Sequence, residues 1–225
     1  MRTHFLIALF FLFFAVAVSA QTERSLSAFD EINVTGNIEV ILEKGDAEKI
    51  FIQAEGIPED ELKVKVDSEV LKLSLINSVF YKNEKVTVRV VFQQIRAIRG
   101  NAGANIRSNV PIEGDQLLLR ANSGAQLKLT VKAKKLDGAA NEGAILTLAG
   151  EVEAQKISAT TGGQYEALDL ECQRTYARAN TGGVASVVAR ESIDASANTG
   201  GSITYKGDPE QHYSKTILGG DVRKL

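Results

Sequence analysis

The sequence predicts an all-β solenoid, in which the chain winds repeatedly around one long axis and each winding stacks on the previous one. The first observation is a phrase of the form Asn-x-Gly or Thr-Gly-Gly that returns every 18 to 21 residues. This period fits one winding of a β-solenoid and is too short for a pair of helices. The second observation is the alternation of apolar and polar residues between the phrases, which is typical of strands. The recurring glycines are Gly103, Gly124, Gly143, Gly162, Gly182, Gly200 and Gly219.

Residues 1–20 are predicted to be a signal peptide outside the fold. Arg2 supplies the positive start, an apolar run follows at 5–18, and the small residues before position 21 suit cleavage after Ala20. A retained anchor is the weaker alternative, because an apolar run of roughly 14 residues is short for a bilayer. No cysteine stands directly after the run, which disfavours a lipid anchor. We therefore expect an exported protein without a stable membrane span after cleavage.

The remaining chain is predicted to form a flexible leader at 21–27 and one solenoid domain at 28–225. Within this domain, 28–99 should contain irregular windings and 100–225 regular ones. Alternating strand patterns begin at Phe29, and two half-buried strands are expected at 62–66 and 71–75 with a hairpin-like or corner turn between them. A polar loop is expected at 76–85, followed by a strand at 86–90. The first third should thus repeat the same architecture with longer windings.

Inward positions of the regular windings follow from the period of two. The residues one and three positions before the first residue of each phrase are small or apolar, which lets the opposite side of the solenoid approach closely. The residues three and five after each phrase glycine are larger and should fill the core. The first set is Gly100 and Ile98, Ala121 and Leu119, Ala140 and Gly138, Ala159 and Ile157, Ala179 and Ala177, Ala197 and Ala195; the second is Leu127 and Leu129, Leu146 and Leu148, Tyr165 and Ala167, Ala185 and Val187, Ile203 and Tyr205.

The repeated phrase itself is predicted to make a corner between two strands. A sharp corner needs a positive φ at one residue, which glycine adopts without steric cost. The amides that open the phrases would stack at the strand spacing of ~4.8 Å and bond to one another. A ligand-binding rail is the alternative for this column. The predicted ladder comprises Asn101, Asn122, Asn141, Thr160, Asn180 and Asn198.

Composition excludes several function classes. Without Arg2, 25 basic and 28 acidic residues remain, with the two signs interleaved, which argues against nucleic-acid or polybasic membrane binding. Cys172 is the single cysteine, so an intrachain disulfide is excluded; its polar neighbours suggest a semi-buried thiol. His212 is the single histidine after residue 20, a poor basis for a triad or metal site.

Known solenoid chemistries do not fit the repeat. The aliphatic residue at every sixth position of hexapeptide acyltransferases fails at Ser123 and Lys135, and the aspartates of calcium-binding nonapeptides are missing from the corners. Asp137 and Asp194 lie three windings apart in one outward column, roughly 14 Å, beyond the ~5 to 9.5 Å of a glycosidase pair. Asp137 beside Lys156 suggests a cross-strand charge pair. We expect no catalytic residues, metal or cofactor.

One outward wall is a candidate for ligand binding. Arg99 and Arg120 occupy neighbouring windings in the column two before the phrase, where they would grip an anionic sugar. Arg178 lies in the same column, while Lys156 and Tyr176 lie in the column four before the phrase. The competing interpretation is an ordinary solvated wall without a ligand.

The chain resembles the bacterial family called putative auto-transporter adhesin, head GIN domain. The resemblance rests on the opening stretch 29–40, the Asn-x-Gly-Ala and Thr-Gly-Gly corners, and the closing stretches 205–209 and 218–220. It covers about residues 28 to 222. It implies an exported, right-handed parallel β-helix of pectin-lyase-like shape without pectin-lyase catalytic residues. Adhesion is the role suggested for the family, which offers no site residues to carry over and is common in Bacteroidetes-type bacteria.

These observations favour a non-catalytic, exported β-solenoid for cell-envelope adhesion or for binding a glycan or protein. One alternative is a polysaccharide lyase or hydrolase with degenerate motifs. Another is a structural envelope module that stacks through its solenoid end, which would make a homo-oligomer. The expected location is the periplasm, the outer surface or the extracellular space.

Overall fold

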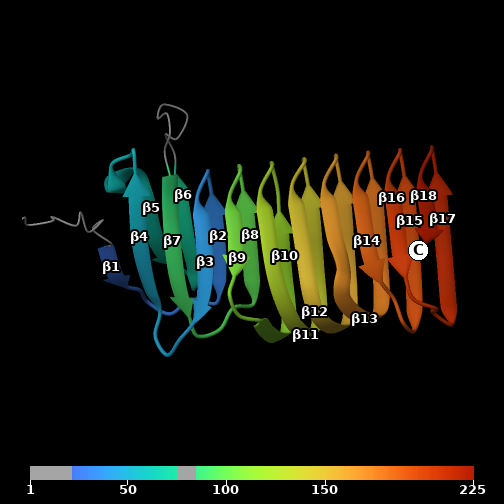
Figure 1. Cartoon of the computed structure of the whole chain (residues 1–225), viewed down its shortest axis with the longest axis horizontal. Helices are drawn as coiled ribbons and strands as arrows, with labels where there is room; N and C mark the ends of the chain where they lie inside the picture. The colour runs from blue at the N-terminus through green and yellow to red at the C-terminus, as the bar shows by residue number, and fades with distance from the viewer. Residues whose placement is uncertain (1–21, 76–84) are drawn as a thin grey trace, which may run out of the picture.

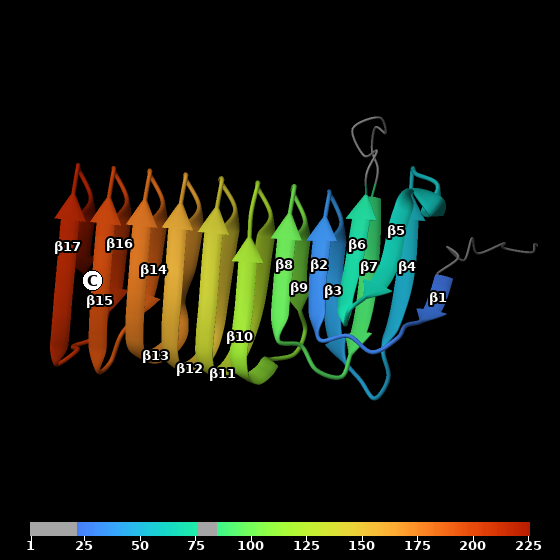
Figure 2. The same ribbon diagram turned by 180° about the vertical axis from the view of Figure 1, so that it is seen from behind.

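The computed structural model describes residues 22–75 and 85–225 as a single elongated stack of strands (Figures 1 and 2). The predicted signal peptide and most of the predicted loop at 76–85 lie outside the described residues. Successive windings pair in parallel register, so the predicted parallel β-solenoid is confirmed. In the described part, the helical content is one 3₁₀ turn, η1 (Glu59–Glu61). No helix among the described residues is long and apolar enough to cross a membrane.

Two large sheets face each other across the core. Sheet 1, which faces the viewer in Figure 2, contains β5 (Leu62–Asp67), β6 (Val70–Leu75), β2 (Glu31–Thr35), β8 (Ala97–Asn101), the second halves of β10 (Ile112–Ala121), β11 (Gln126–Asn141), β12 (Ile145–Thr160) and β13 (Gln164–Asn180), then β15 (Ser192–Asn198) and β17 (Gln211–Ile217). Sheet 2 contains β1 (Thr22–Ser25), β4 (Lys49–Glu55), β7 (Lys85–Phe92), β3 (Glu39–Lys44), β9 (Asn105–Ser108), the first halves of β11 to β13, then β14 (Val184–Val188), β16 (Ser202–Lys206) and β18 (Asp221–Lys224).

The core lies between these sheets, and the predicted inward positions are buried, which confirms them. Small residues on one sheet face large ones on the other. Tyr165 of sheet 2 is fully buried against Gly138 of sheet 1, where an added Cβ would lie 2.7 Å from the tyrosine ring. The small column predicted from the sequence therefore makes room for specific bulky side chains, as close packing requires.

Each corner turns on two left-handed residues, one more than predicted. Ser123 has φ 51° and Gly124 has φ 73°, and the Ala125 N–H donates to the Asn122 carbonyl at 3.1 Å. These φ values with this hydrogen bond are typical of a type I′ turn. The other corners repeat the pattern, with Thr161, Thr181 and Thr199 in the first left-handed position. An added Cβ at Gly124 would meet open space, so its conformation and not crowding selects glycine there.

Side-chain amides form a hydrogen-bonded ladder beneath the corners. Asn122 donates to Asn101 at 3.1 Å, Asn141 donates to Asn122 at 2.9 Å, and the Thr160 hydroxyl donates to Asn141 at 2.6 Å. Asn198 donates to Asn180 at 3.1 Å as a separate pair. The Asn198 Oδ1 atom is buried and accepts no hydrogen bond from the described residues. In the next winding its register partner is Ile217, which has no side-chain donor.

Ile217→Asn is expected to stabilise the protein by about 1 kcal/mol, because the new amide would donate to the buried Asn198 Oδ1. Ile217 is 43% exposed, so little apolar burial is lost. For a chain of this length we expect the melting temperature to rise by roughly 2 to 4 °C. Ile217→Ala is the control, since it removes the same side chain without adding a donor. Equal melting temperatures for the two variants would contradict the explanation.

The N-terminal third departs from simple winding, which corrects two predictions. The winding β2–β3 lies between β6–β7 and β8–β9, so the strand order in space differs from the order in sequence. Beyond this point β5 pairs antiparallel with β6, and β4 pairs antiparallel with β7. The predicted flexible leader contains β1, which pairs antiparallel with β4 at Thr22–Ser25. Antiparallel strands thus close this end of the solenoid, where the sequence suggested longer, irregular windings of the same architecture. The turn at 67–69 is a hairpin turn.

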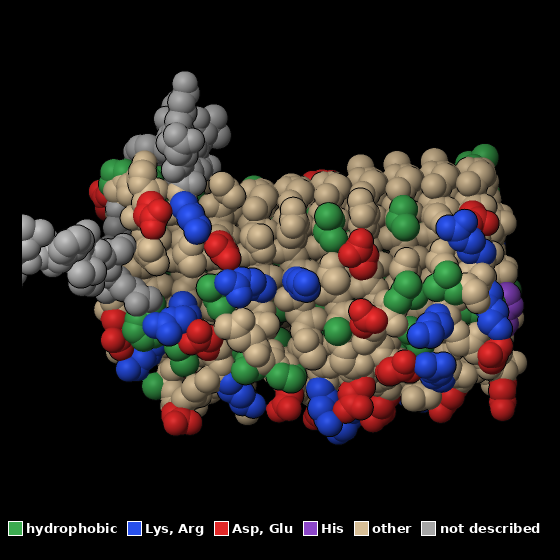
Figure 3. Space-filling model, viewed as in Figure 1, with side chains coloured by type: hydrophobic (Ala, Val, Ile, Leu, Met, Phe, Trp, Pro, Cys, Tyr) green, Lys and Arg blue, Asp and Glu red, His purple; other side chains and the backbone are tan. Residues whose placement is uncertain are grey.

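The outer surface of sheet 2 carries both charges in an interspersed pattern (Figure 3). Exposed ion pairs such as Lys132 to Glu151 at 2.7 Å and Lys134 to Asp115 at 2.8 Å join neighbouring windings. The hydrogen bond from Lys134 stabilises the ionised carboxylate of Asp115 and so lowers the pKa of that group. A surface with both signs interspersed offers no single-sign field for a polyanion.

Candidate functional site: a groove along sheet 1

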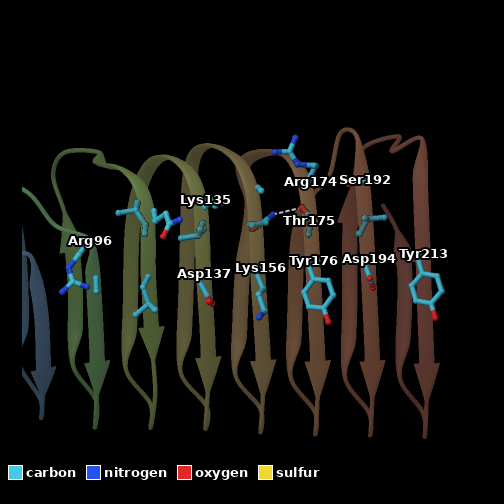
Figure 4. Close-up of a pocket in the computed structure, with 18 of the residues that line it drawn as sticks. Arg96, Lys135, Asp137, Lys156, Arg174, Thr175, Tyr176, Ser192, Asp194 and Tyr213 are labelled. Carbon is cyan, nitrogen blue, oxygen red and sulfur yellow. Dashed lines mark hydrogen bonds between the residues drawn. The ribbon is translucent and has the colours of Figure 1, made fainter.

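An outward column of side chains runs along sheet 1 in the register predicted from the repeat. Its members lie on consecutive paired strands, and each step along the solenoid is one strand spacing of ~4.8 Å. The column reads Ala97, Leu118, Asp137, Lys156, Tyr176, Asp194 and Tyr213. Figure 4 shows its last five members side by side.

Beside this column lies a groove with a volume of about 1050 Å³. It follows sheet 1 from β8 to β17, close to the bend where β11, β12 and β13 leave sheet 2. A second row of residues lines the groove at that bend, namely Gln116, Lys135, Ala154, Arg174, Ser192 and Gln211. The groove is therefore a continuous path across several windings.

The two arginines predicted to grip a ligand are bound to carboxylates of the protein. Arg99 forms an ion pair with Glu31 of β2, whose side chain is also bonded by Arg96 at 2.7 Å. Arg120 donates to the Asp137 carboxylate at 2.9 Å and to the Asp137 carbonyl at 3.0 Å. The predicted pair of Asp137 with Lys156 is thus wrong, because Arg120 reaches Asp137 diagonally from the neighbouring strand.

Two lysines of the groove have no ion-pair partner among the described residues. Lys135 and Lys156 are both exposed, and within 22–75 and 85–225 neither forms an ion pair. Arg174 lies next to them and pairs with Glu191 at 3.4 Å, both side chains being more than half exposed. Exposed pairs of this kind contribute little free energy, so Arg174 can exchange its partner for a ligand. The central part of the groove therefore offers cationic groups to a ligand.

Tyrosine rings lie further along the same groove. Tyr176 is half-buried and Tyr213 is 60% exposed. Both rings are seen nearly face-on in Figure 4, with Asp194 between them. The guanidinium of Arg178 lies 5.0 Å from the centroid of the Tyr176 ring, which fixes that ring by a cation–π contact. The exposed ring of Tyr213 suits stacking on a flat or weakly polar ligand, while Arg178 covers one face of the Tyr176 ring.

Beneath the groove, a buried polar network joins its floor to the core. Tyr165 donates to the Gln155 oxygen at 3.0 Å, and the Gln155 amide donates to Thr175 at 3.0 Å, a bond marked in Figure 4. Thr175 in turn donates to the Val188 carbonyl at 2.7 Å. Burial raises the pKa of the Tyr165 hydroxyl well above its usual range. The hydroxyl therefore remains a proton donor and holds the floor in place.

Cys172 lies close to this network and is fully buried, which corrects the prediction of a semi-buried thiol. Its thiol donates to the Arg174 carbonyl at 3.2 Å, and burial raises its pKa. A protonated, inaccessible thiol is a poor nucleophile. In the described part of the chain no cluster of three or more metal-ligating side chains is found. His212 stacks on Tyr205 at a centroid distance of 5.5 Å.

Of the predicted wall, Arg99, Lys156 and Tyr176 line the groove, while Arg120 and Arg178 lie beside it. Sequence reasoning missed Lys135, Arg174 and Tyr213. Tyr213 lies six residues before Gly219, as Tyr176 lies six before Gly182, so extending the outward column by one winding finds it. Lys135 and Arg174 lie six positions before their phrases, and the period of two places this column on the same outward face, so extending the pattern by one step finds them.

Comparison with known proteins places these features in a family. A family model described as putative auto-transporter adhesin, head GIN domain, matches residues 28–209. A crystal structure of a putative adhesin from Parabacteroides merdae is similar with a TM-score of 0.71 and 20% identity, covering 92% of this chain and 95% of that chain.

Two structures from Parabacteroides distasonis are also similar. One is described as a putative adhesin, with a TM-score of 0.71, 20% identity and coverage of 92% of this chain and 96% of that one. The other is described as a putative lipid binding protein, with a TM-score of 0.67, 18% identity and the same coverages. At these identities the likeness shows the fold alone, and none of the curated proteins matches the chain. The match across residues 28–209 shows that the chain belongs to the putative auto-transporter adhesin, head GIN domain family.

Proposed function

We propose that the protein is a non-catalytic binding module of the cell envelope that holds an extended glycan along the groove of sheet 1. The observation that carries this proposal is the groove itself, an open path of about 1050 Å³ lined by charged and amide side chains, tyrosine rings and apolar side chains such as Leu118 and Ile193. Because the solenoid repeats similar positions at each winding, it can contact a linear polymer at several points along its length. Several weak contacts of this kind add to a useful affinity.

Family membership supports adhesion and an exported or surface location. A similar structure is described as a lipid binding protein. In this chain, charged and amide side chains such as Lys156, Asp194 and Gln211 line the groove, and burying them against acyl chains would be costly. The lining therefore favours a sugar polymer over a lipid tail. We place the module in the periplasm or on the outer surface.

The carboxylates of the groove support a non-catalytic role. Asp137 and Asp194 are separated by three strand steps, roughly 14 Å, whereas glycoside hydrolysis requires a carboxylate pair within ~5 to 9.5 Å. Asp137 is also engaged by Arg120. This arrangement suits recognition of hydroxyl groups better than acid–base chemistry.

Binding of the intact chain to an array of linear glycans tests the proposal. We expect binding that falls about tenfold or more in the double variant Tyr176→Ala/Tyr213→Ala, because stacking on rings is lost. Leu168→Ala removes an exposed apolar side chain at 37% exposure outside the groove and is the matched control.

Three outcomes would overturn the proposal. The first is absence of binding to every glycan by folded protein, and the second is binding only to lipid vesicles. The third is cleavage of a bound polymer, which would support the alternative of a lyase or hydrolase.

A further inference from the structure

Three basic side chains surround Ala154 in the middle of the groove. Lys135 and Arg174 are the register partners of Ala154 on its two sides, so each lies one strand spacing of ~4.8 Å away along the solenoid. Lys156 follows Ala154 by two residues on the same face of β12, a further ~6.6 Å along the strand. The methyl group of Ala154 is too small to fill the space between these longer side chains. The short Ala154 side chain among these longer ones defines a position that we call the Ala154 hollow, with the three basic residues on the strands around it.

Two of these cations are available to a ligand, and the third, Arg174, forms only the exposed pair with Glu191 at 3.4 Å. Arg96 and Arg99 bind Asp30 and Glu31 at one end, whereas Lys135 and Lys156 have no carboxylate partner in the described residues. An anion at this position would be attracted by each of the three positive charges. The hollow around Ala154 is therefore complementary to one negatively charged group.

The charge of the groove also differs in sign from that of the chain. Its lining contains five basic side chains and three acidic ones, a formal charge of +2, while the whole chain carries −2. A cationic groove on an acidic protein directs an anionic polymer to this face and away from the others.

The two tyrosines place the polymer relative to the hollow. Tyr176 and Tyr213 lie two strand steps apart, about 9.6 Å. This separation corresponds to alternate rings of an extended sugar chain rather than to adjacent ones. Tyr176 is the direct register neighbour of Lys156, so a sugar stacked on its ring would bring a charged substituent to the hollow. Asp194, between the tyrosines, would accept hydrogen bonds from hydroxyl groups.

We propose that the Ala154 hollow is an anion subsite that makes the groove selective for linear acidic polysaccharides, through a carboxylate or sulfate carried by the sugar ring. This inference rests on the proposed glycan-binding function and adds the chemical class of the ligand. Lys135, Lys156 and Arg174 bind the anionic group, while Tyr176 and Tyr213 bind alternate sugar rings. The carboxylate and the sulfate share the required charge, and the experiment below separates them.

Affinities of the intact chain for three probes test the subsite: oligogalacturonate, the same oligomer with its carboxyl groups reduced to alcohols, and a sulfated dextran oligomer. We expect oligogalacturonate or the sulfated oligomer to bind at least about tenfold more tightly than the reduced oligomer, because charge-assisted hydrogen bonds are lost in the latter. Lys135→Gln/Lys156→Gln should remove this preference, so that the charged and the reduced oligomers bind with equal affinity. Added salt should weaken binding of the charged probes only.

Lys128→Gln is the matched control, since Lys128 is an exposed lysine on the sheet 2 part of β11, outside the groove. Equal affinity of the wild-type protein for charged and reduced oligomers would overturn the anion subsite while leaving glycan binding intact. An equal loss in the control and the double variant would also overturn it. Failure of all three probes, with binding to anionic lipid vesicles instead, would overturn both the subsite and the glycan-binding function.

Discussion

Replacing Gly150 with alanine is expected to destabilise the protein by about 3 kcal/mol or more. Gly150 lies where β12 bends between the two sheets, with φ +114°, a region that residues with a side chain rarely adopt. An added Cβ would lie 2.1 Å from the carbonyl oxygen of Val131, its register partner in the previous winding. Because that oxygen belongs to the backbone of a paired strand, a side-chain rotation cannot relieve the clash.

A fall in melting temperature of roughly 6 to 12 °C would follow for a chain of this length. Gly162→Ala is the matched control, since Gly162 also has a positive φ, +72°, but an added Cβ there meets open space. Its cost should be only ~1 to 2 kcal/mol, the usual cost of the left-handed conformation. Thermal unfolding followed by circular dichroism compares the two variants. Equal losses would show that the close approach to Val131 does not limit the residue at position 150.

Replacing Tyr165 with alanine is expected to cost about 4 to 5 kcal/mol. The side chain is fully buried and occupies the space opposite Gly138, so truncation leaves a cavity that the neighbouring glycine cannot fill. Truncation also removes the hydroxyl that donates to Gln155 and leaves a buried amide oxygen without its donor. Both losses fall on the floor of the groove, because Gln155 and Thr175 line it.

Tyr165→Phe separates the two contributions. It retains the ring and removes only the hydroxyl, so its expected cost is about 1 to 3 kcal/mol. Urea unfolding of both variants gives the free energies of unfolding. If Tyr165→Phe were as damaging as Tyr165→Ala, the hydrogen bond rather than the ring would dominate, contrary to the packing argument. A neutral Tyr165→Phe would show that the Gln155 oxygen finds another donor.

The regular windings could be predicted almost residue by residue. Their strands pair in parallel register, so positions equally far before a corner phrase meet, as Asp137, Lys156 and Tyr176 do. Periodicity of two then assigns each residue to the core or the surface. The bend at Gly150 was not predicted, because no column of glycines marks it in the sequence. Strand β13 makes the same bend without a glycine, by an extra residue and a register shift near Ala149.

The site was predicted in part. Its column of Lys156 and Tyr176 followed from the repeat, but the availability of each charge did not. Arg99 and Arg120 looked like free ligands in the sequence, yet their partners are Glu31, far away in sequence, and Asp137, a diagonal neighbour. Ion-pair choice depends on side-chain reach across strands, which a one-dimensional pattern does not contain.

By itself, the sequence determined the solenoid, its winding length, its inward columns and its corner glycines, because each follows from local φ requirements and a period of two repeated at a constant interval. Only the tertiary structure decided how the N-terminal end closes, since β2 pairs with β6 and β8 through contacts between distant segments. The structure also decided which charges remain free around Ala154. Long-range strand order and side-chain partnership are properties of the assembled stack, and no single winding encodes them.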